Sequence, residues 1–173
     1  SVWTWGYNGE GELGNGTNSP QFTPKLSGLV PGSGTVAISA GCLHTLALKD
    51  DGSVWAWGRN WYSVLGDGGT GDSYTPAQIS SLGTDNVAVS AGCTYSLALK
   101  KDGSVWAWGR NFDGELGDGT TMNRTVPTLT SLGPGSGITA ISAGHQINTN
   151  PFPGAADGPH SLALKEDGSV WAW

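Results

Sequence analysis

Carboxylates gather in two glycine-rich stretches of this 173-residue chain. One stretch contains Asp67 and Asp72, and the other contains Asp113, Glu115 and Asp118. Oxygen-rich loops of this kind can hold Ca²⁺, but the spacing matches no established calcium loop. We therefore interpret these side chains as turn residues and predict no metal site.

A second motif with chemical potential is Gly9-Glu10-Gly11-Glu12-Leu13-Gly14, which fits the dinucleotide-binding pattern literally. That pattern works only where a helix follows and its N-terminus receives the pyrophosphate. No helical periodicity follows here, and the similar segment at residues 60–66 lacks the glycines. We predict a loop at this position and no cofactor.

Histidine recurs at one position of the sequence pattern. His44 and His160 each precede an aliphatic run, and Tyr95 stands at the corresponding position between them. A catalytic histidine needs a neighbouring nucleophile or acid, and the sequence marks none. We interpret His44 and His160 as hydrogen-bonded scaffold residues and predict that the chain is not an enzyme.

The two cysteines also recur, as Ala-Gly-Cys42-Leu-His and Ala-Gly-Cys93-Thr-Tyr. A disulfide needs Cα atoms within about 7 Å, a distance that the sequence does not supply. We therefore favour two free, buried thiols over a bridge.

These residues belong to an internal repeat. Ser-Val-Trp begins at Ser1, Ser53, Ser104 and Ser169, which divides the chain into residues 1–52, 53–103, 104–168 and the start of a fourth repeat at 169–173. The third repeat is longer because residues 145–159 form an insertion. A constant period of this length indicates one supersecondary unit used several times.

Each repeat predicts four short strands, at residues 54–57, 77–79, 87–90 and 96–99 in the second repeat. The aromatic strands carry Trp55 and Trp57, and Trp106 and Trp108, on one face. Because both faces are apolar, we expect these tryptophans to pack between neighbouring sheets. Asp-Gly pairs between the aliphatic and aromatic strands indicate hairpin turns in which both central residues have positive φ.

Composition agrees with an all-β chain and limits its partners. The 29 glycines and nine tryptophans suit strands joined by tight turns. The formal net charge of −6 provides no field for a nucleic-acid backbone. No stretch reaches the roughly 20 apolar residues of a membrane-spanning helix. We expect a protein partner, no nucleic-acid partner and no membrane insertion.

The run Asp-Gly-Ser-Val-Trp-Ala-Trp-Gly-Arg-Asn, followed by Gly-Glu-Leu-Gly-Asp-Gly-Thr, Ile-Ser-Ala-Gly and His-Ser-Leu-Ala-Leu-Lys, resembles the repeats of the regulator of chromosome condensation family. The resemblance covers essentially the whole chain. It implies an all-β propeller whose blades each have four antiparallel strands, and family members typically have seven blades. About three blades fall short of a ring, so either a longer parent chain or self-association would complete it.

The loops between strands are the places where we expect recognition. Tyr62 and Tyr74 are candidate partner-binding residues in the second repeat. The insertion adds Asn148, Phe152 and Asp157, with Phe152 held between two prolines. A neutral, tolerated insertion is an equally good interpretation.

The leading functional hypothesis is a non-catalytic recognition module or scaffold. Guanine-nucleotide exchange on a small GTPase is the alternative that the resemblance implies. Light sensing by clustered tryptophans, known in a plant member, is disfavoured because Gly41-Cys42-Leu43-His44-Thr45 lacks the required Trp and Arg. The motifs resemble those of bacterial cell-surface or secreted members, which favours an extracellular or cell-surface location over a cytoplasmic one.

Overall fold

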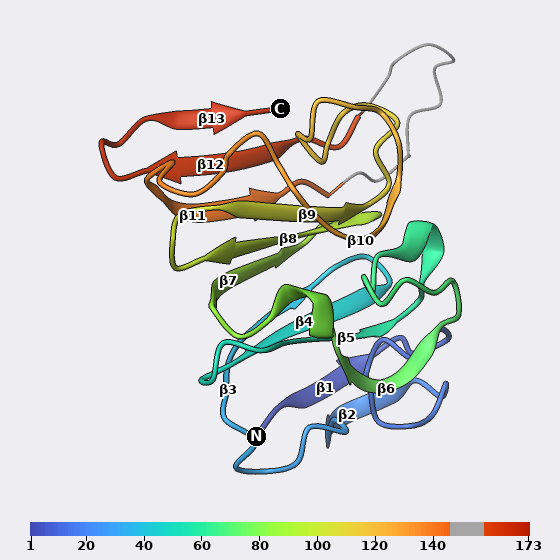
Figure 1. Ribbon diagram of the computed structural model, residues 1–173. Helices are drawn as coiled ribbons and strands as arrows, with labels where there is room; N and C mark the ends of the chain where they lie inside the picture. The colour runs from blue at the N-terminus through green and yellow to red at the C-terminus, as the bar shows by residue number, and fades with distance from the viewer. Residues whose placement is uncertain (146–157) are drawn as a thin grey trace.

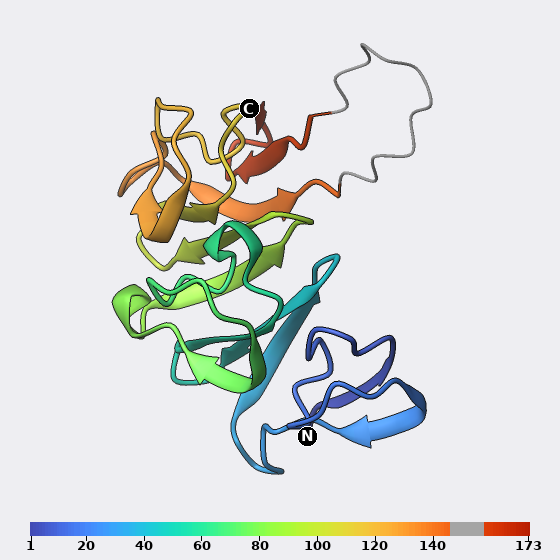
Figure 2. The same cartoon turned by 90° about the vertical axis from the view of Figure 1, so that its right-hand side faces the viewer.

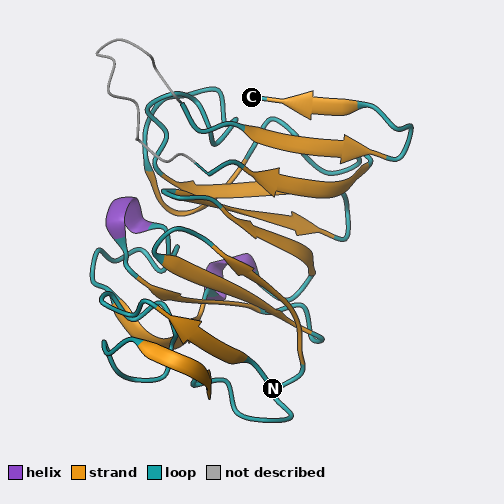
Figure 3. Ribbon diagram, turned by 180° about the vertical axis from the view of Figure 1, so that it is seen from behind, coloured by secondary structure: helices purple, strands orange, loops and turns teal. Residues whose placement is uncertain are grey.

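The computed structural model of the protein describes residues 1–145 and 158–173 (Figure 1). This part of the chain is built from strands and turns, with two three-residue helical turns, η1 (Trp61–Ser63) and η2 (Ser80–Leu82) (Figure 3). Neither the length nor the hydrophobicity of a membrane-spanning helix is found in any helical segment of the described residues.

The strands form four antiparallel sheets that follow one another along the molecule (Figures 1 and 2). Two sheets have four strands. The first, which we call blade 2, contains β3 (Thr35–Ala40), β4 (His44–Lys49), β5 (Val54–Gly58) and β6 (Ser73–Gln78). The second, blade 3, contains β7 (Asn86–Ala91), β8 (Tyr95–Lys100), β9 (Val105–Gly109) and β10 (Arg124–Leu129). The prediction of four-stranded antiparallel blades is confirmed.

Two smaller sheets flank these blades. Blade 1 consists of β1 (Trp3–Gly6) and β2 (Gln21–Leu26), and blade 4 of β11 (Ile138–Ala143), β12 (Ser161–Lys165) and β13 (Val170–Ala172). The sheets are offset from the sequence repeats, because each repeat begins at an aromatic strand, and in blades 2 and 3 that strand is the third of the sheet. The second repeat thus supplies β5 and β6 to blade 2, and β7 and β8 to blade 3. Consecutive blades are therefore linked within each repeat.

Two local details differ from the sequence-based expectation. The strand expected at 77–79 begins earlier, at Ser73, and includes Pro76. Proline is tolerated there because β6 is the edge of its sheet, where no further strand needs the missing N–H. In the Asp-Gly turns only the glycine has positive φ, 80° at Gly52, while the Asp51 carboxylate accepts a hydrogen bond from the Ser53 N–H at 2.8 Å.

The core combines aliphatic side chains with tryptophans that pack between blades. Trp57 and Trp108 are completely buried, and Trp55 and Trp106 are partly buried. The Leu-Gly pair of each preceding loop lies directly against the buried ring. At Gly66, whose φ is +68°, an added Cβ would lie 2.7 Å from the Trp108 indole nitrogen. A glycine is needed here because the loop backbone touches the ring.

Candidate partner-binding surface

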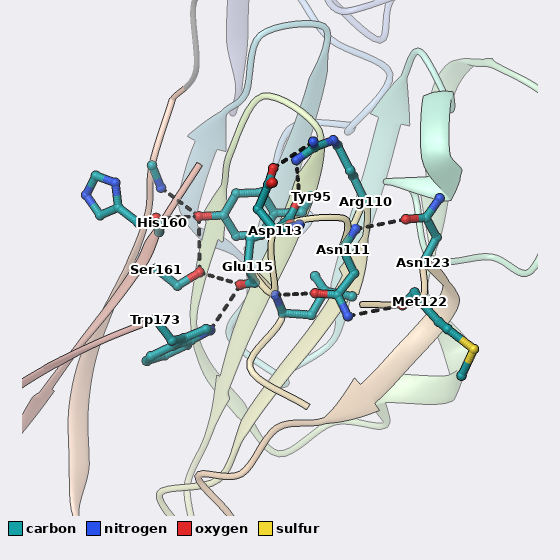
Figure 4. Close-up of polar contacts among 12 residues, drawn as sticks. Tyr95, Arg110, Asn111, Asp113, Glu115, Met122, Asn123, His160, Ser161 and Trp173 are labelled. Atoms are coloured by element: carbon teal, nitrogen blue, oxygen red, sulfur yellow. Dashed lines mark hydrogen bonds and ion pairs between the residues drawn. The ribbon is translucent and has the colours of Figure 1, made fainter. Parts of the chain in front are cut away.

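A long loop follows each of the aromatic strands β1, β5 and β9 in blades 1, 2 and 3, and a buried asparagine holds each loop. In blade 3 the Asn111 Oδ1 accepts the Leu116 N–H at 3.0 Å, and its Nδ2 donates to the Met122 carbonyl at 3.1 Å (Figure 4). The same Nδ2 donates to the Thr120 carbonyl at 3.0 Å. Asn8 makes the same three bonds, with the Leu13 N–H and the carbonyls of Thr17 and Ser19. Asn60 makes two of them, with the Leu65 N–H and the Gly69 carbonyl. Sequence analysis did not single out these residues, although their recurrence with the repeat period was a readable signal.

A second repeated contact ties each loop to the next blade. The Val64 carbonyl accepts the Trp108 indole N–H at 2.7 Å and the Ser96 hydroxyl at 2.9 Å. The Glu115 carbonyl receives the same pair of donors from Trp173 and Ser161 (Figure 4). The Glu12 carbonyl receives them from Trp57 and Thr45. We call this contact the interblade clamp. It fixes the loops to a rigid framework and leaves their outer side chains to vary.

His44 is buried at the same interface, and its Nε2 lies 2.9 Å from the Ser96 hydroxyl. Because Ser96 donates its single proton to Val64, the Ser96 oxygen is assigned as the acceptor of the His44 Nε2–H. Burial, aided by the positive charge that His145 can carry, lowers the pKa of His44 to about 4. The neutral ring therefore acts in packing and hydrogen bonding.

Tyr95 takes the place of His44 in blade 3. Its hydroxyl donates to the His160 carbonyl at 2.7 Å and accepts the Gly144 N–H at 2.8 Å (Figure 4). Burial raises the pKa of Tyr95 despite the hydrogen bond from the Gly144 N–H and the adjacent Ser161 hydroxyl. The His160 side chain is exposed, so its position in the repeat does not give it the same surroundings as His44.

The acidic loop residues are engaged in ion pairs and turns. Arg110 binds Glu115 at 2.6 Å and Asp113 at 2.7 Å, and Arg124 binds Asp118 at 2.6 Å. Burial of Asp118 would raise its pKa, but hydrogen bonds from Thr120 and Arg124 outweigh it and leave the pKa lowered. Among the described residues, no group of three His, Cys, Asp or Glu side chains is placed to hold a metal ion.

The prediction of two free, buried thiols is wrong, because Cys42 and Cys93 form a disulfide. The cysteines follow β3 and β7, the first strands of blades 2 and 3, and the packing of these blades side by side brings equivalent positions to a Cα separation of 4.5 Å. Cys42 is exposed and Cys93 is partly exposed. The bridge thus lies at the surface, between the two complete blades.

The disulfide borders a pocket of about 410 Å³ between blades 2 and 3. Its other walls are Leu43, His44 and Thr94, with Arg59, Trp61, Tyr62 and Val64 from the blade 2 loop and Arg110 from the blade 3 loop. Trp61 and Tyr62 are 58% and 41% exposed, and Phe112 beside them is 55% exposed. The rings of Tyr62 and Phe112 meet edge to face at 5.8 Å.

The structure separates the sequence-predicted binding residues. Tyr62 lines the pocket, whereas Tyr74 lies on β6 and faces Gly11 of the blade 1 loop. Asn148, Phe152 and Asp157, and most of the insertion at 145–159, lie outside the described residues. Sequence analysis missed Arg59, Trp61 and Phe112, although the recurring Gly-Arg-Asn followed by an aromatic residue marks them.

Comparison with known proteins places these features in a family context. The family model described as "Regulator of chromosome condensation (RCC1) repeat" matches residues 1–48, 51–99 and 102–149. The human E3 ubiquitin-protein ligase HERC2 is 31% identical over 175 residues, which cover 99% of this chain and 3% of HERC2. The Arabidopsis thaliana ultraviolet-B receptor UVR8 is 34% identical over 152 residues, covering 86% of this chain and 34% of the receptor.

Among solved structures, Prp20p from Saccharomyces cerevisiae is similar with a TM-score of 0.76 and 28% identity, over 99% of this chain and 40% of Prp20p. That structure was described together with the binding of Prp20p to Gsp1p and histones. This chain therefore spans well under half of the length of each of these relatives.

Proposed function

The chain belongs to the regulator of chromosome condensation (RCC1) repeat family, and from this premise we propose that it is a non-catalytic protein-recognition module. The observation that carries the proposal is the cluster of Trp61, Tyr62 and Phe112, exposed on loops that buried asparagines and the interblade clamps hold rigid. Exposed aromatic and arginine side chains on a fixed framework commonly contribute most of the binding free energy of protein interfaces.

Two further observations support binding without turnover. The buried loop carboxylates form ion pairs with Arg110 and Arg124, and His44 is hydrogen-bonded to Ser96 within the scaffold. Such groups are poorly placed to transfer protons to or from a substrate. The net charge of −6 favours partners with a basic surface at long range and disfavours nucleic acid.

The proposal can be tested by photocrosslinking. A benzophenone amino acid at position 62 would report proteins that approach the pocket, and the same group in place of Val126, which is 42% exposed on β10, would serve as the matched control. We expect one protein to crosslink at position 62 and not at position 126, with loss of the crosslink when Trp61 and Phe112 are changed to Ala. Equal labelling at both positions would contradict recognition by this surface.

Guanine-nucleotide exchange is the second candidate, and its support is the similarity to Prp20p, which binds Gsp1p. The test is release of a fluorescent GDP analogue from Gsp1p on addition of the purified chain. Under the recognition proposal, release proceeds at its spontaneous rate. Acceleration of about tenfold or more would favour exchange instead.

We also propose an extracellular or cell-surface location. The exposed bridge between Cys42 and Cys93 supports it, because disulfides persist mainly in oxidising compartments. Alkylation of the protein in intact source cells, followed by mass spectrometry, tests this. Recovery of both cysteines in alkylated form would contradict the proposal.

A further inference from the structure

The three long loops carry different combinations of one arginine and two carboxylates. Alignment on the buried asparagines places Arg110 at the position of Arg59, Asp113 at that of Tyr62, and Glu115 at that of Val64. In blade 3 all three charged groups are present, and Arg110 pairs with both carboxylates. Blade 3 therefore shows how this loop satisfies an arginine at its base.

Arg59 in blade 2 has neither of these partners, because Tyr62 and Val64 occupy the two carboxylate positions. Within the described residues, its ion pair is with Glu10 of the neighbouring loop, at 3.5 Å. Its guanidinium lies over the Trp61 ring, 3.3 Å from the ring centroid. An arginine fork has five N–H donors, so Arg59 keeps donor capacity that Arg110 has used.

The backbone around Tyr62 points to a site in its own right. Tyr62 and Ser63 have φ values of 56° and 62°, the positive values at non-glycine positions in the described chain. Glycine occupies the position of Ser63 in the other two loops, as Gly11 and Gly114. Left-handed conformations are unfavourable for a non-glycine residue, and such strain gathers at functional sites. Here it accompanies the exposure of Tyr62 at the pocket.

The pocket that Arg59 borders is largely apolar elsewhere. Leu43, Trp61 and Val64 line it, and its volume of about 410 Å³ can hold a carboxylate together with a neighbouring apolar side chain. The Arg110 that also lines it is already neutralised by Glu115 and Asp113. Arg59 is thus the cation in this wall with capacity for an incoming anion.

We infer that this pocket receives an acidic side chain, Asp or Glu, that a protein partner presents next to an aromatic residue. The partner's carboxylate would take the place at Arg59 that Glu115 holds at Arg110, and its aromatic ring would lie among Leu43, Trp61 and Val64. A free polyanion is a poorer occupant because the chain carries a net charge of −6. The inference rests on the proposed recognition function and specifies the chemistry of the partner.

The test uses the peptide N-acetyl-Phe-Glu-amide as the probe and N-acetyl-Phe-Gln-amide as its uncharged control. Binding is followed by NMR through the Trp61 indole N–H and the Arg59 Nε–H. We expect saturable shifts with the Glu peptide and at least tenfold weaker binding of the Gln peptide. Arg59→Gln should weaken binding of the Glu peptide at least tenfold, whereas Lys101→Gln, at an exposed turn away from the pocket, should leave it unchanged.

Val64→Glu gives an independent test because it rebuilds in blade 2 the carboxylate that blade 3 possesses. The new Glu side chain should pair with Arg59 and thereby weaken binding of the Glu peptide at least tenfold. If Val64→Glu fails to fold, Arg59→Gln still decides the question. Equal affinity for the Glu and Gln peptides, or unchanged affinity in Arg59→Gln, would overturn the inference. A crosslinked partner at position 62 in that case would leave the recognition function standing without the acidic preference.

Discussion

Blades 2 and 3 have the same framework and different surfaces. Both use a buried asparagine to hold the long loop and a tryptophan to clamp the preceding loop. Yet the arginine at the base of the loop is paired twice in blade 3 and loosely in blade 2. The buried residue that begins the aliphatic strand also changes, from His44 to Tyr95.

This contrast teaches which contacts tolerate exchange. The framework bonds of the loops end mainly on backbone atoms, such as the Leu65 N–H and the Val64 carbonyl, which persist whatever side chain occupies the position. The side chain at this position of the loop can therefore differ between blades, as Val64 in blade 2 and Glu115 in blade 3 show. Repeats built in this way can keep one fold while each loop acquires its own binding chemistry.

The largest expected effect concerns the shared framework. Trp57→Ala and Trp108→Ala should each reduce the free energy of unfolding by about 3 to 5 kcal/mol, because each removes a completely buried ring and an interblade clamp bond. Urea unfolding followed by circular dichroism measures the loss. Trp61→Ala, at an exposed ring, is the control and should cost less than about 1 kcal/mol. A large difference between Trp57→Ala and Trp108→Ala would break the claim of equivalent frameworks.

The exchange of His44 for Tyr95 predicts a pH dependence specific to blade 2. The pKa of His44 is about 4 when folded and 6.5 ordinarily, so the unfolded chain binds this proton more readily. The stabilising contribution is complete above pH 6.5 and is lost as the pH falls towards 4, by at most about 3 kcal/mol. His44→Tyr, which copies blade 3, should remove this part of the slope in urea unfolding measured from pH 7 to pH 4.5. An unchanged slope would count against the assignment.

A smaller effect separates the two arginines. Glu115→Gln should lower the free energy of unfolding by about 2 kcal/mol, because it removes the charge from a buried hydrogen bond to Arg110. Arg59→Gln should change the free energy by less than about 1 kcal/mol, because its pair with Glu10 is long and partly exposed. The two variants can be compared in the same unfolding assay. Equal losses would mean that Arg59 is as fully engaged as Arg110.

The smallest effect concerns backbone strain in the blade 2 loop. Ser63→Gly should stabilise the protein by about 0.5 to 1 kcal/mol, because glycine adopts the φ of 62° without the steric cost of a Cβ. The matched control is Ser131→Gly, because Ser131 is exposed and its φ is not positive. This change should be slightly destabilising. Destabilisation by Ser63→Gly would show that the loop carries no releasable strain.

Much of the fold could be predicted from the sequence because the repeat period and strand alternation are local signals. The aromatic strand expected at 54–57 is observed as Val54–Gly58, and the aliphatic one at 96–99 as Tyr95–Lys100. The strand that contains Pro76 was expected to begin at residue 77 but begins at Ser73. A strand at the edge of a sheet can contain proline, and the sequence alone does not show which strand is at the edge.

The candidate site was less predictable because it forms between blades. Tyr62 was anticipated from its place in a loop, but the pairing of Arg110 with Glu115 and the poor pairing of Arg59 emerge only when the loops are superposed. The disulfide was missed for the same reason. A separation of 51 residues along the chain gives no indication that Cys42 and Cys93 are neighbours in space.

That disulfide has a mechanical consequence. If the molecule is pulled from its two ends, the segment between Cys42 and Cys93 bears no tension after its strands separate, because the bridge carries the force past it. Because the cysteines are 51 positions apart, the force does not extend a segment whose full length would be about 170 to 180 Å. At full extension an oxidised molecule is therefore shorter than a reduced one by this length, and a segment as long as one repeat is not stretched.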